Sequence, residues 1–571
     1  MLFYEYLKGE IFEIVKKLLD EKNLESDFLE NKSFNIELSH NPDFGDLSSN
    51  VALVFSKFFK TSPENLAELI SDKLRENKYV SKVEVVKPGF INIFFSDLFW
   101  QNQLSQFIKI DGSYDYNIKT KSICIEFVSA NPTGLMHIGH ARGAVLGDAI
   151  SSVLEEVGHN ITREYYINDA GEQIKKLKET ILFHLDNMNR NPTKKLTDDL
   201  YPGEYLENVA KKILNKFTVK NVSELQNLDE KIIDIVLTDI KKDLVQLNII
   251  HDNFVSEKNI SSLNSINKLK NKLLKSELAY FGFQEKPKNI SDEHWEKKEQ
   301  LLFCSKKFGD DSDRALMKPN GEVTYFMSDL LYHTNKIKRK FEILINIWGV
   351  DHFGYVKRLK SALSSLVKDD YILEIKLTSL VNLIKKGEKL KMSKRKGNYI
   401  TMREVTKEVG VDALRFMMVS RNADKTIDFD FDTLKNKNKD NPVFYVQYAY
   451  ARCMSILEIS TKKIKEIEKG DYKLEDLVLH EEKMLIKYIC NFYNVIKNSA
   501  EFFEPHRITN YLYDLSKIFH NYWGLGNIDK EKKVITDNDE VTKSRLVLIK
   551  VVSMTLNKGL SLLKINSPKS M

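Results

Sequence analysis

Residues 129–145, SANPTGLMHIGHARGAV, follow the apolar run KSICIEFV at 121–128. The β-branched and aromatic residues of that run predict a buried strand, and the NPTG segment after it predicts a turn. We expect a helix to begin directly after the turn, with His137 and His140 at its start. A strand, a turn and a helix in this order are typical of an open α/β sheet.

Three further apolar runs suggest how this sheet continues. They are ITREYYI at 161–167, VTYFMS at 323–328 and FEILINIWGV at 341–350, and helical patterns separate them. Short apolar strands interleaved with helices predict a doubly wound parallel sheet of the Rossmann type. Ligands of such a sheet bind beyond the carboxyl ends of its strands, which is where the two histidines would lie.

Changes in pattern divide the chain into three predicted domains. Residues 1–98 begin with helical patterns and finish with SKVEVVKPGFINIFF, which predicts strands of a small α+β domain. Residues 99–440 hold the α/β domain, and a lysine- and asparagine-rich helical insertion interrupts it at about 173–300. Residues 441–571 have few glycines and a helical period, which predicts an all-α bundle.

Composition narrows the class of protein. The chain has 571 residues and a formal net charge of +6, so charge alone does not indicate nucleic-acid binding. Its four cysteines lie far apart in apolar surroundings, which predicts buried thiols in a reducing compartment and neither a disulfide framework nor a zinc site. No apolar run reaches about 18 residues and the first residues form an amphipathic helical pattern, so we expect neither a membrane span nor a signal peptide.

The start of a helix at this edge of the sheet suits a phosphate chain. Free N–H groups and the positive end of the helix dipole would face the phosphates. Imidazole donors from His137 and His140 would stabilise the charge that develops at the α-phosphorus of ATP, and Gly139, which lacks a Cβ atom, would let a flat base lie on the backbone. Two alternatives remain at this point: a pair of surface histidines, or a metal-binding pair three residues apart.

The segment ANPTGLMHIGH at 130–140 resembles the HIGH signature of class I aminoacyl-tRNA synthetases. The second signature of that class is a lysine-rich loop after the last strand, and KMSKRKGN at 391–398 is similar to it, with Arg395 in place of the more common serine. A solvated basic loop is the alternative for this segment alone. The two signatures occur in the right order on either side of the insertion, which favours the family.

Several further segments are similar to arginyl-tRNA synthetases in particular. The N-terminal region carries FGDLSSNVA at 44–52 and PGFIN at 88–92. The matching segments in the rest of the chain are GEVTYFMSDLLYHTNK at 321–336, WGVDHFGYVKR at 348–358, DALR at 412–415, NPVFYVQYAYAR at 441–452 and the terminal SPKSM. The resemblance therefore covers nearly the whole chain and is weakest in the insertion.

The resemblance assigns roles to particular residues. It implies transition-state stabilisation by His137, His140, Lys391 and Lys394. The implied ATP contacts are Pro132, Thr133, Gly134, His137, Gly139, His140, Met392 and Ser393. The implied arginine contacts are Glu126, Asn131, Tyr325, Asp329, Asp351 and His352. The implied tRNA contacts are Phe90, Asn92, Tyr445, Gln447, Tyr448 and Arg452; for the first two, ordinary strand packing is the alternative. The region 385–440 would hold the lysine-rich loop and a surface for the tRNA stem.

Residue chemistry supports an arginine pocket independently. In the strand ICIEFV, Glu126 lies on the opposite face from the isoleucines, and a carboxylate in a central strand needs a partner, which an arginine substrate would supply. Tyr325 and Asp329 are four residues apart, where we expect a strand to pass into a helix, so both could close one pocket. The alternatives are a helix-start charge for Asp329 and a simple turn residue for Asn131.

The function implied by the resemblance is ligation of arginine to tRNA. Arginine would attack the α-phosphate of Mg-ATP to give arginyl-adenylate and pyrophosphate, and the amino acid would then pass to the terminal adenosine of its tRNA. We expect a cytoplasmic monomer without a structural metal or a membrane anchor.

Three alternatives stay open on the sequence. A nucleotidyltransferase that makes a small adenylylated cofactor would lack the C-terminal helices. A class I synthetase for another amino acid, such as cysteine or glutamate, would need a different pocket, and the cysteine enzyme would need thiolate zinc ligands that the four scattered cysteines do not offer. A non-catalytic RNA-binding relative would be expected to have lost the HIGH or the loop signature.

Overall fold

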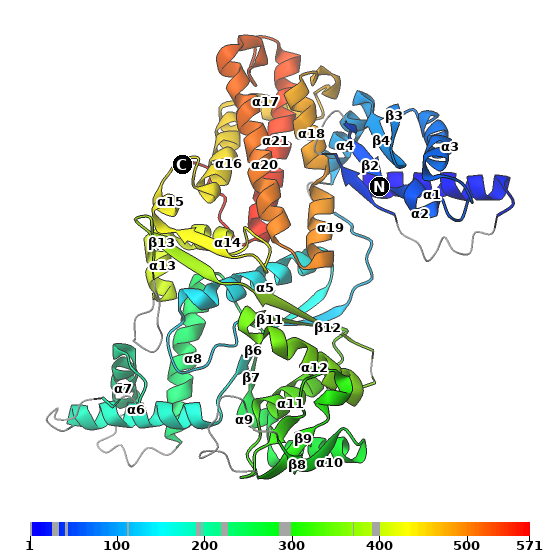
Figure 1. The fold of residues 1–571 in the computed structure, drawn as a ribbon. Coiled ribbons are helices and arrows are strands. Elements are labelled where there is room, and N and C mark those ends of the chain that lie inside the picture. The colour runs from blue at the N-terminus through cyan, green and yellow to red at the C-terminus, as the bar shows by residue number, and fades with distance from the viewer. Residues whose placement is uncertain are drawn as a thin grey trace.

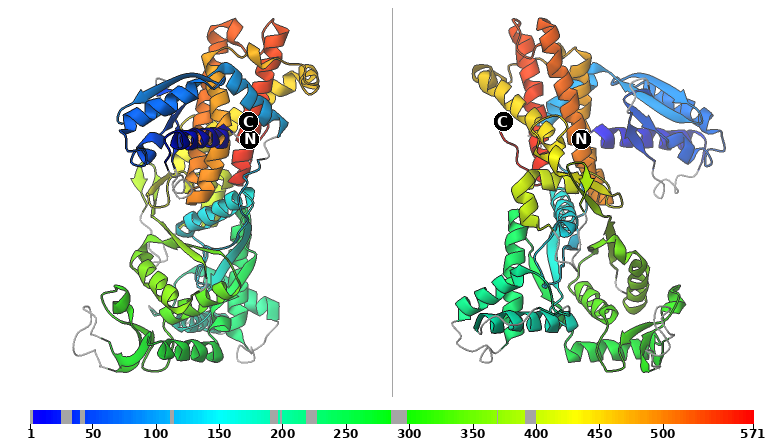
Figure 2. Two further views of the ribbon diagram at one scale, coloured as in Figure 1. Left: turned by 90° about the vertical axis from the view of Figure 1, so that its right-hand side faces the viewer. Right: turned by 60° about the vertical axis from the view of Figure 1, so that its left-hand side comes forward.

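The computed structural model has an N-terminal domain beside a tall helical bundle, with an α/β domain below both (Figure 1; Figure 2). The structure describes residues 3–24, 34–39, 44–110, 114–189, 196–197, 199–217, 227–284, 298–368, 370–390 and 400–571. Within these ranges, no helix is long and apolar enough to cross a membrane. The four cysteines are buried and free.

A five-stranded parallel sheet is the centre of the α/β domain. Its strand order is β12-β11-β5-β6-β7, and every neighbouring pair is parallel. The doubly wound sheet predicted from the apolar runs is therefore confirmed. The strands are β5 (Ser122–Glu126), β6 (Asn160–Ile167), β7 (Asn253–Ser256), β11 (Ile343–Gly349) and β12 (Ile372–Thr378).

The two faces of this sheet are covered by different helices. Ile123 and Ile125 point into the core that they share with α5 (Ile138–Glu156), whereas Cys124 points into the core on the other face. The alternation expected for the strand ICIEFV is thus observed. The second core is formed with α10 (Leu263–Lys275), α11 (Tyr325–Lys338) and α12 (Phe353–Leu366).

The start of α11 differs from the prediction. The run VTYFMS at 323–328 was expected to be a strand, but helix α11 begins at Tyr325, inside that run. Val323 makes only an isolated bridge to Met317. The apolar residues of the run, Phe326 and Met327, are buried on the helix, and a run this short does not distinguish a strand from a buried helix turn.

The predicted insertion at 173–300 is interrupted by a strand of the main sheet. Strand β7 lies within that range and pairs in parallel with β6, because its short run NFVS completes the sheet edge. Three helices precede it, namely α6 (Glu172–Asn189), α7 (Glu204–Phe217) and α8 (Leu228–Gln246). After it come α9 (Glu257–Ile260), α10 and a small antiparallel sheet of β8 (Ala279–Phe283), β9 (Glu299–Phe303) and β10 (Arg314–Met317).

The N-terminal domain combines helices with a four-stranded antiparallel sheet of order β1-β2-β4-β3. The predicted strands around Pro88 are β3 (Val80–Val86) and β4 (Phe90–Phe95). The other elements are β1 (Ile36–Leu38), β2 (Leu47–Ser49), α1 (Phe3–Glu21), α2 (Val51–Phe55), α3 (Pro63–Arg75) and α4 (Asp97–Lys109), and the last of these contacts the bundle.

The bundle follows a small connecting region. That region holds β13 (Val381–Lys385), β14 (Glu388–Lys389), α13 (Met402–Val409), α14 (Val411–Met418), β15 (Ile427–Asp430) and α15 (Phe431–Lys435). The bundle itself comprises α16 (Pro442–Ile459), α17 (Thr461–Ile467), α18 (His480–Cys490), α19 (Phe492–Phe502), α20 (His506–Ile528) and α21 (Asp539–Leu562). Residues of the N-terminal domain, helix α5 and the bundle share one apolar core, so these parts are packed together.

Candidate active site

The two histidines cap the first turn of α5. His137 is the N-cap residue, and its Nδ1 accepts the N–H of Gly139 at 3.1 Å. The Nδ1 of His140 accepts the N–H of His137 at 3.2 Å. Because both Nδ1 atoms act as acceptors, each neutral ring carries its proton on Nε2. The rings stack 3.9 Å apart, so two Nε2–H donors lie side by side at the positive end of a 19-residue helix.

The local sequence explains this geometry. A Cβ atom at Gly139 would lie 2.9 Å from the ring of His137, so the glycine is needed for the cap to close. The preceding turn is held by the N–H of Thr133, which donates to the carbonyl of Asn131 at 2.7 Å. Tyr205 of α7 donates to the carbonyl of Thr133 and lies against Gly134. The helices before β7 therefore cover the turn that leads into the site.

The segment that follows the lysine-rich loop in the sequence pairs with the backbone beside these histidines. Lys391, Met392, Ser393 and Lys394 lie outside the described residues, as does Arg395. Ile400 is the first described residue after the loop, and its carbonyl accepts the N–H of Ile138 at 3.2 Å. The N–H of Met402 donates to the carbonyl of Met136 at 2.9 Å, so the segment after the loop runs antiparallel to residues 136–138.

Glu126 is buried at the carboxyl end of β5 and already has a charged partner. Lys336 of α11 donates to its Oε2 at 2.7 Å, and Ser129 donates to its Oε1 at 3.0 Å. We expected an arginine substrate to supply the partner that Glu126 needs. That expectation is wrong, because Lys336 is already its partner. The ion pair spans 210 residues of sequence, which is why the strand pattern alone did not reveal it.

Lys336 is fixed by a chain of neutral groups. It also donates to Oδ1 of Asn346 at 3.1 Å, and Nδ2 of Asn346 lies 2.7 Å from Nε2 of His333. Burial lowers the pKa of His333 to about 3, so the ring is neutral. Its Nδ1–H donates to the carbonyl of Asp329 at 2.8 Å, which leaves Nε2 as the acceptor.

Asp329 lies one helical turn into α11, and its ionisation is sensitive to the surroundings. Burial and the nearby carboxylates of Glu126 and Glu257 raise the pKa of Asp329, the hydrogen bond from Tyr355 at 2.6 Å lowers it, and the net pKa is about 7. A charge stabilised by the helix dipole would lie in the first turn of the helix. The helix begins at Tyr325, so Asp329 lies beyond that first turn. This placement argues against the helix-start alternative.

The other predicted arginine contacts are more open. Tyr325 is 70% exposed and stands one turn before Asp329, on the same side of α11. Asn131 is exposed in the turn after β5. In the short helix η6 (Val350–His352) at the end of β11, Nε2 of His352 lies 3.5 Å from Oδ2 of Asp351, and both side chains face solvent.

Several polar residues of the site were not predicted. Tyr166 of β6 and Glu257 after β7 have buried oxygen atoms, Oη and Oε2, and their side chains lie close to each other. Both follow the rule that the carboxyl ends of parallel strands meet, which could have identified them. Val128 and Ser129 have φ angles of 70° and 38°, and this left-handed turn directs the Ser129 hydroxyl to Glu126.

Some of the predicted tRNA contacts are exposed and others are buried. Tyr448 is exposed on α16, where Arg452 donates to its hydroxyl at 2.7 Å and also stacks on Trp523. Gln447 is buried and donates to Asp412 at 2.9 Å.

On the N-terminal sheet, Phe90 is 39% exposed, whereas Asn92 is only 4% exposed. Strand packing is therefore the better description of Asn92. Tyr445, on the same helix as Arg452, packs on His520 and Tyr513.

Comparison with known protein families agrees with this architecture. A model of the arginyl tRNA synthetase N terminal domain matches residues 6–95. A model of the catalytic domain of class I (R) tRNA synthetases matches residues 103–442, and a model of the DALR anticodon binding domain matches residues 446–571.

Individual proteins give the same result. The chain is 38% identical to the arginine–tRNA ligase of Pelagibacter ubique over 580 aligned residues, covering 100% of both chains. It is 40% identical to that of Ehrlichia ruminantium (strain Welgevonden), covering 93% of each. The fold is similar to that of the Thermus thermophilus arginyl-tRNA synthetase, with a TM-score of 0.72 at 19% identity over 99% of this chain and 100% of that one.

The parallel sheet and the histidine-capped helix define a class I aminoacyl-tRNA synthetase. Within that class, the full-length matches show that the chain belongs to the arginyl-tRNA synthetase family.

Proposed function

We propose that this chain activates L-arginine with ATP and transfers it to the terminal adenosine of its tRNA. The observation that carries the proposal is the junction of β5 and α5. Glu126 ends the strand, and eleven residues later His137 caps the helix, so the proposed arginine contact and the proposed phosphate donors lie on one strand-turn-helix unit. Parallel sheets bind their ligands at this edge.

In the first step, a carboxylate oxygen of arginine attacks the α-phosphorus of ATP. The new bond joins arginine to AMP, and the bond to the bridging oxygen breaks, so that pyrophosphate leaves with its electron pair. The Nε2–H groups of His137 and His140 stabilise the charge that builds up on the α-phosphate oxygens. Lys391 and Lys394 neutralise the departing pyrophosphate, and Mg²⁺ enters with ATP as part of the substrate complex.

The remaining ATP contacts in this proposal come from the turn and the loop. Pro132, Thr133 and Gly134 line the entry to α5, and Gly139 gives the adenine access to the backbone. Met392 and Ser393 belong to the lysine-rich loop. The pairing of Ile400 with Ile138 supports this arrangement, because it holds the residue that follows the loop in the sequence beside the histidines.

Arginine recognition is assigned to the carboxylates of Glu126 and Asp329. The planar guanidinium offers paired N–H groups to carboxylate oxygens, whereas the ammonium of lysine is a single point charge. Tyr325 would cover the guanidinium plane at the mouth of the pocket. Asn131, Asp351 and His352 would orient the arginine main-chain groups.

In the second step, a hydroxyl of the terminal adenosine attacks the arginyl carbonyl and AMP leaves. The tRNA would lie along the bundle, with Tyr445, Tyr448 and Arg452 offering stacking faces and positive charge. Phe90 would stack on a base at the outer corner of the tRNA. Gln447 and Asn92 belong to the same two regions, but their amides would have to move to reach RNA.

The chain is proposed to act as a monomer in the cytoplasm. Four buried, free thiols are in keeping with a reducing compartment.

Pyrophosphate exchange tests the activation step. Exchange of labelled pyrophosphate into ATP should be measured with each of the twenty amino acids, with and without tRNA. The proposal predicts exchange with arginine and with none of the other nineteen amino acids. Exchange that is equal or faster with lysine, cysteine or glutamate would contradict the assigned pocket, and no exchange under any condition together with tRNA binding would indicate an RNA-binding protein.

A further inference from the structure

Helix α5 is the element on which the other parts of the molecule converge. Its side chains contact α14, α19 and α21, and its N-terminus carries the histidine pair. Arg142 is buried on this helix and donates to the carbonyls of Ser379 at 2.8 Å and Asn422 at 2.9 Å, which belong to the connecting region. Further along α5, a second buried charge faces the bundle.

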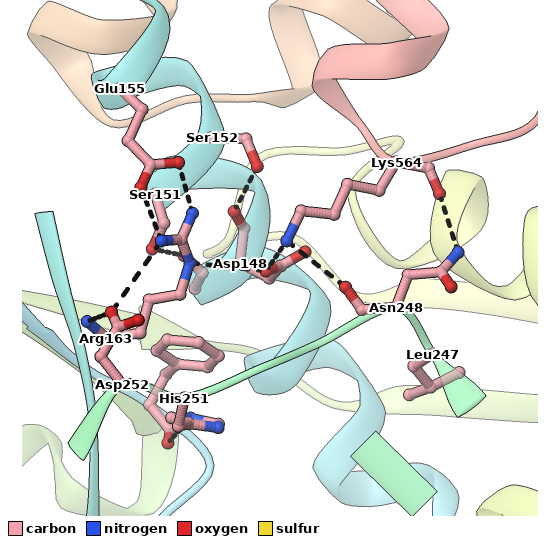
Figure 3. Close-up of polar contacts among 12 residues, drawn as sticks. Asp148, Ser151, Ser152, Glu155, Arg163, Leu247, Asn248, His251, Asp252 and Lys564 are labelled. Atoms are coloured by element: carbon pink, nitrogen blue, oxygen red, sulfur yellow. Dashed lines mark hydrogen bonds and ion pairs between the residues drawn. The ribbon is translucent and has the colours of Figure 1, made fainter. Parts of the chain in front are cut away.

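That charge is Asp148, which is fully buried and lies near three cations: Arg415, Lys564 and, at 3.8 Å, Arg163. Figure 3 shows Lys564 and Arg163 beside it. Its Oδ2 accepts from Nη2 of Arg415 at 2.7 Å, and its Oδ1 accepts from Nζ of Lys564 at 2.6 Å. Arg415 is also fully buried and donates to the carbonyls of Leu563 at 2.8 Å and Leu247 at 2.6 Å. One carboxylate on α5 therefore joins α14, the end of α8 and the end of α21.

Lys564 reaches Asp148 from an unusual backbone conformation. It follows the last turn of α21, where its N–H bonds to the carbonyl of Ser561 and its φ angle is 51°. Glycine is the usual residue at such a left-handed helix end, and a lysine there is strained. Its ammonium also donates to the carbonyl of Asn248, whose own φ is 59°. Figure 3 shows Lys564 between Asp148 and Asn248.

A positive φ angle alone does not distinguish Lys564 from other lysines of the chain. Lys60, Lys340 and Lys386 also have positive φ angles, but they are exposed. Lys564 differs because its side chain is directed inward to a buried carboxylate. The strained backbone and the buried ion pair are thus found at the same residue.

We propose that Lys564 is a positioning residue for catalysis, which acts through Asp148 on the histidine pair. Asp148 is eight residues beyond His140, a distance of about 12 Å along a single rigid helix. A shift of the helix at Asp148 therefore displaces the donors at its N-terminus. The inference rests on the proposed role of His137 and His140 in the activation step.

The competing explanation is that Lys564 only docks the bundle. The chain offers a matched control, because Lys558 of α21 forms an ion pair with Glu156 at the end of α5 at 2.7 Å, close to the 2.6 Å between Lys564 and Asp148. The two lysine side chains are 34% and 31% exposed. A general loss of docking would affect both positions equally, whereas positioning through Asp148 requires Lys564 alone.

Four full-length variants test the proposal: Lys564→Met, Lys564→Gly, Lys564→Arg and Lys558→Met. The Gly variant removes the ammonium and also relieves the left-handed backbone, so its melting temperature should be above that of Lys564→Met, which loses the same charge and keeps the strain. We expect kcat for tRNA arginylation to fall about ten- to hundredfold in the Met and Gly variants, with KM for tRNA within about twofold of wild type. Lys564→Arg should recover most of kcat, and Lys558→Met should retain it.

A second readout does not depend on activity. Amide hydrogen exchange at Ile138 and His140 should be several-fold faster in Lys564→Met and Lys564→Gly than in wild type or Lys558→Met. Unchanged kcat in the stable Gly variant, or equal losses at positions 558 and 564, would overturn the proposal. Altered exchange without any arginylation by the wild type would instead contradict the proposed function.

Discussion

Asp329 connects the chemistry of the pocket with a measurable pH dependence. Burial raises the pKa of its carboxyl to about 7, while the guanidinium of arginine remains charged throughout the neutral range. Only the ionised carboxylate forms a charge pair, so arginine should bind more tightly as pH rises through 7. We predict that KM for arginine falls about tenfold between pH 6 and pH 8. The Asp329→Asn variant should have a higher KM for arginine that does not change with pH. If KM showed the same pH dependence in both enzymes, the Asp329 carboxyl would not be the source of that dependence.

Discrimination against lysine provides a second test of the same residue. Replacing Asp329 with Ala should cost on the order of 3 to 5 kcal/mol in kcat/KM for arginine, because a buried guanidinium would lose a paired charge. Lysine, which cannot use both carboxylates fully, should lose much less. The measurement is the ratio of kcat/KM for arginine to that for lysine in both enzymes. An unchanged ratio would place the guanidinium elsewhere.

The histidine pair is predicted to act in the transition state. Changing His140 to Asn should lower the rate of adenylate formation about 10²- to 10³-fold and leave arginine affinity nearly unchanged. Single-turnover kinetics separate these two quantities. A variant that keeps more than roughly a tenth of the wild-type rate would remove His140 from the mechanism.

At the scale of single residues, the sequence was informative where chemistry depends on local spacing. The strand and turn before His137 predicted a helix start at the two histidines, and the structure shows how each ring accepts a backbone N–H. Lys336 was not foreseen, because its partner Glu126 is 210 residues away. Tyr166 and Glu257 were missed for the same reason: their proximity to Asp329 exists only after the sheet has formed.

At the scale of elements, the central strands were predicted, and the edge strands β7 and β12 were not. Strands β5, β6 and β11 correspond to long apolar runs with β-branched residues. Strand β7 has four residues, too few for its period to be recognised among helices, so the insertion was drawn through it. The run VTYFMS has apolar residues in both possible phases, and its burial on α11 is decided by the second core.

Packing of α5 on β5 gives a prediction at this scale. A Cβ atom at Gly147 would overlap the ring of Phe127, whereas the atom nearest to a Cβ at Gly143 would be in Ile347, 3.8 Å away. Gly147→Ala should therefore destabilise the protein by about 1 to 3 kcal/mol through overpacking. Gly143→Ala in the same helix should be neutral or slightly stabilising. Equal stabilities in denaturant titrations would contradict the close packing of α5 on this strand.

At the scale of the whole molecule, the fold class was predicted correctly, and the domain boundaries near residues 98 and 440 remain predictions. What the sequence did not indicate is how tightly the parts are joined. Gln447, predicted as a tRNA contact, instead bridges Asp412 and the carbonyl of Asn566, and Arg415 bonds Leu563. Two residues of the DALR segment thus hold the C-terminal end of the chain against the α/β domain, a relation that requires the folded molecule.

The most direct test of the central claim is to identify which tRNA the full-length protein charges, and with which amino acid. Unfractionated tRNA would be incubated with the protein, ATP and one amino acid at a time, oxidised with periodate, and the protected molecules sequenced. Charging protects the terminal adenosine from oxidation. The account predicts protection of arginine-accepting tRNA only, and only when arginine is supplied. Protection of other tRNAs, or protection with lysine in place of arginine, would contradict it.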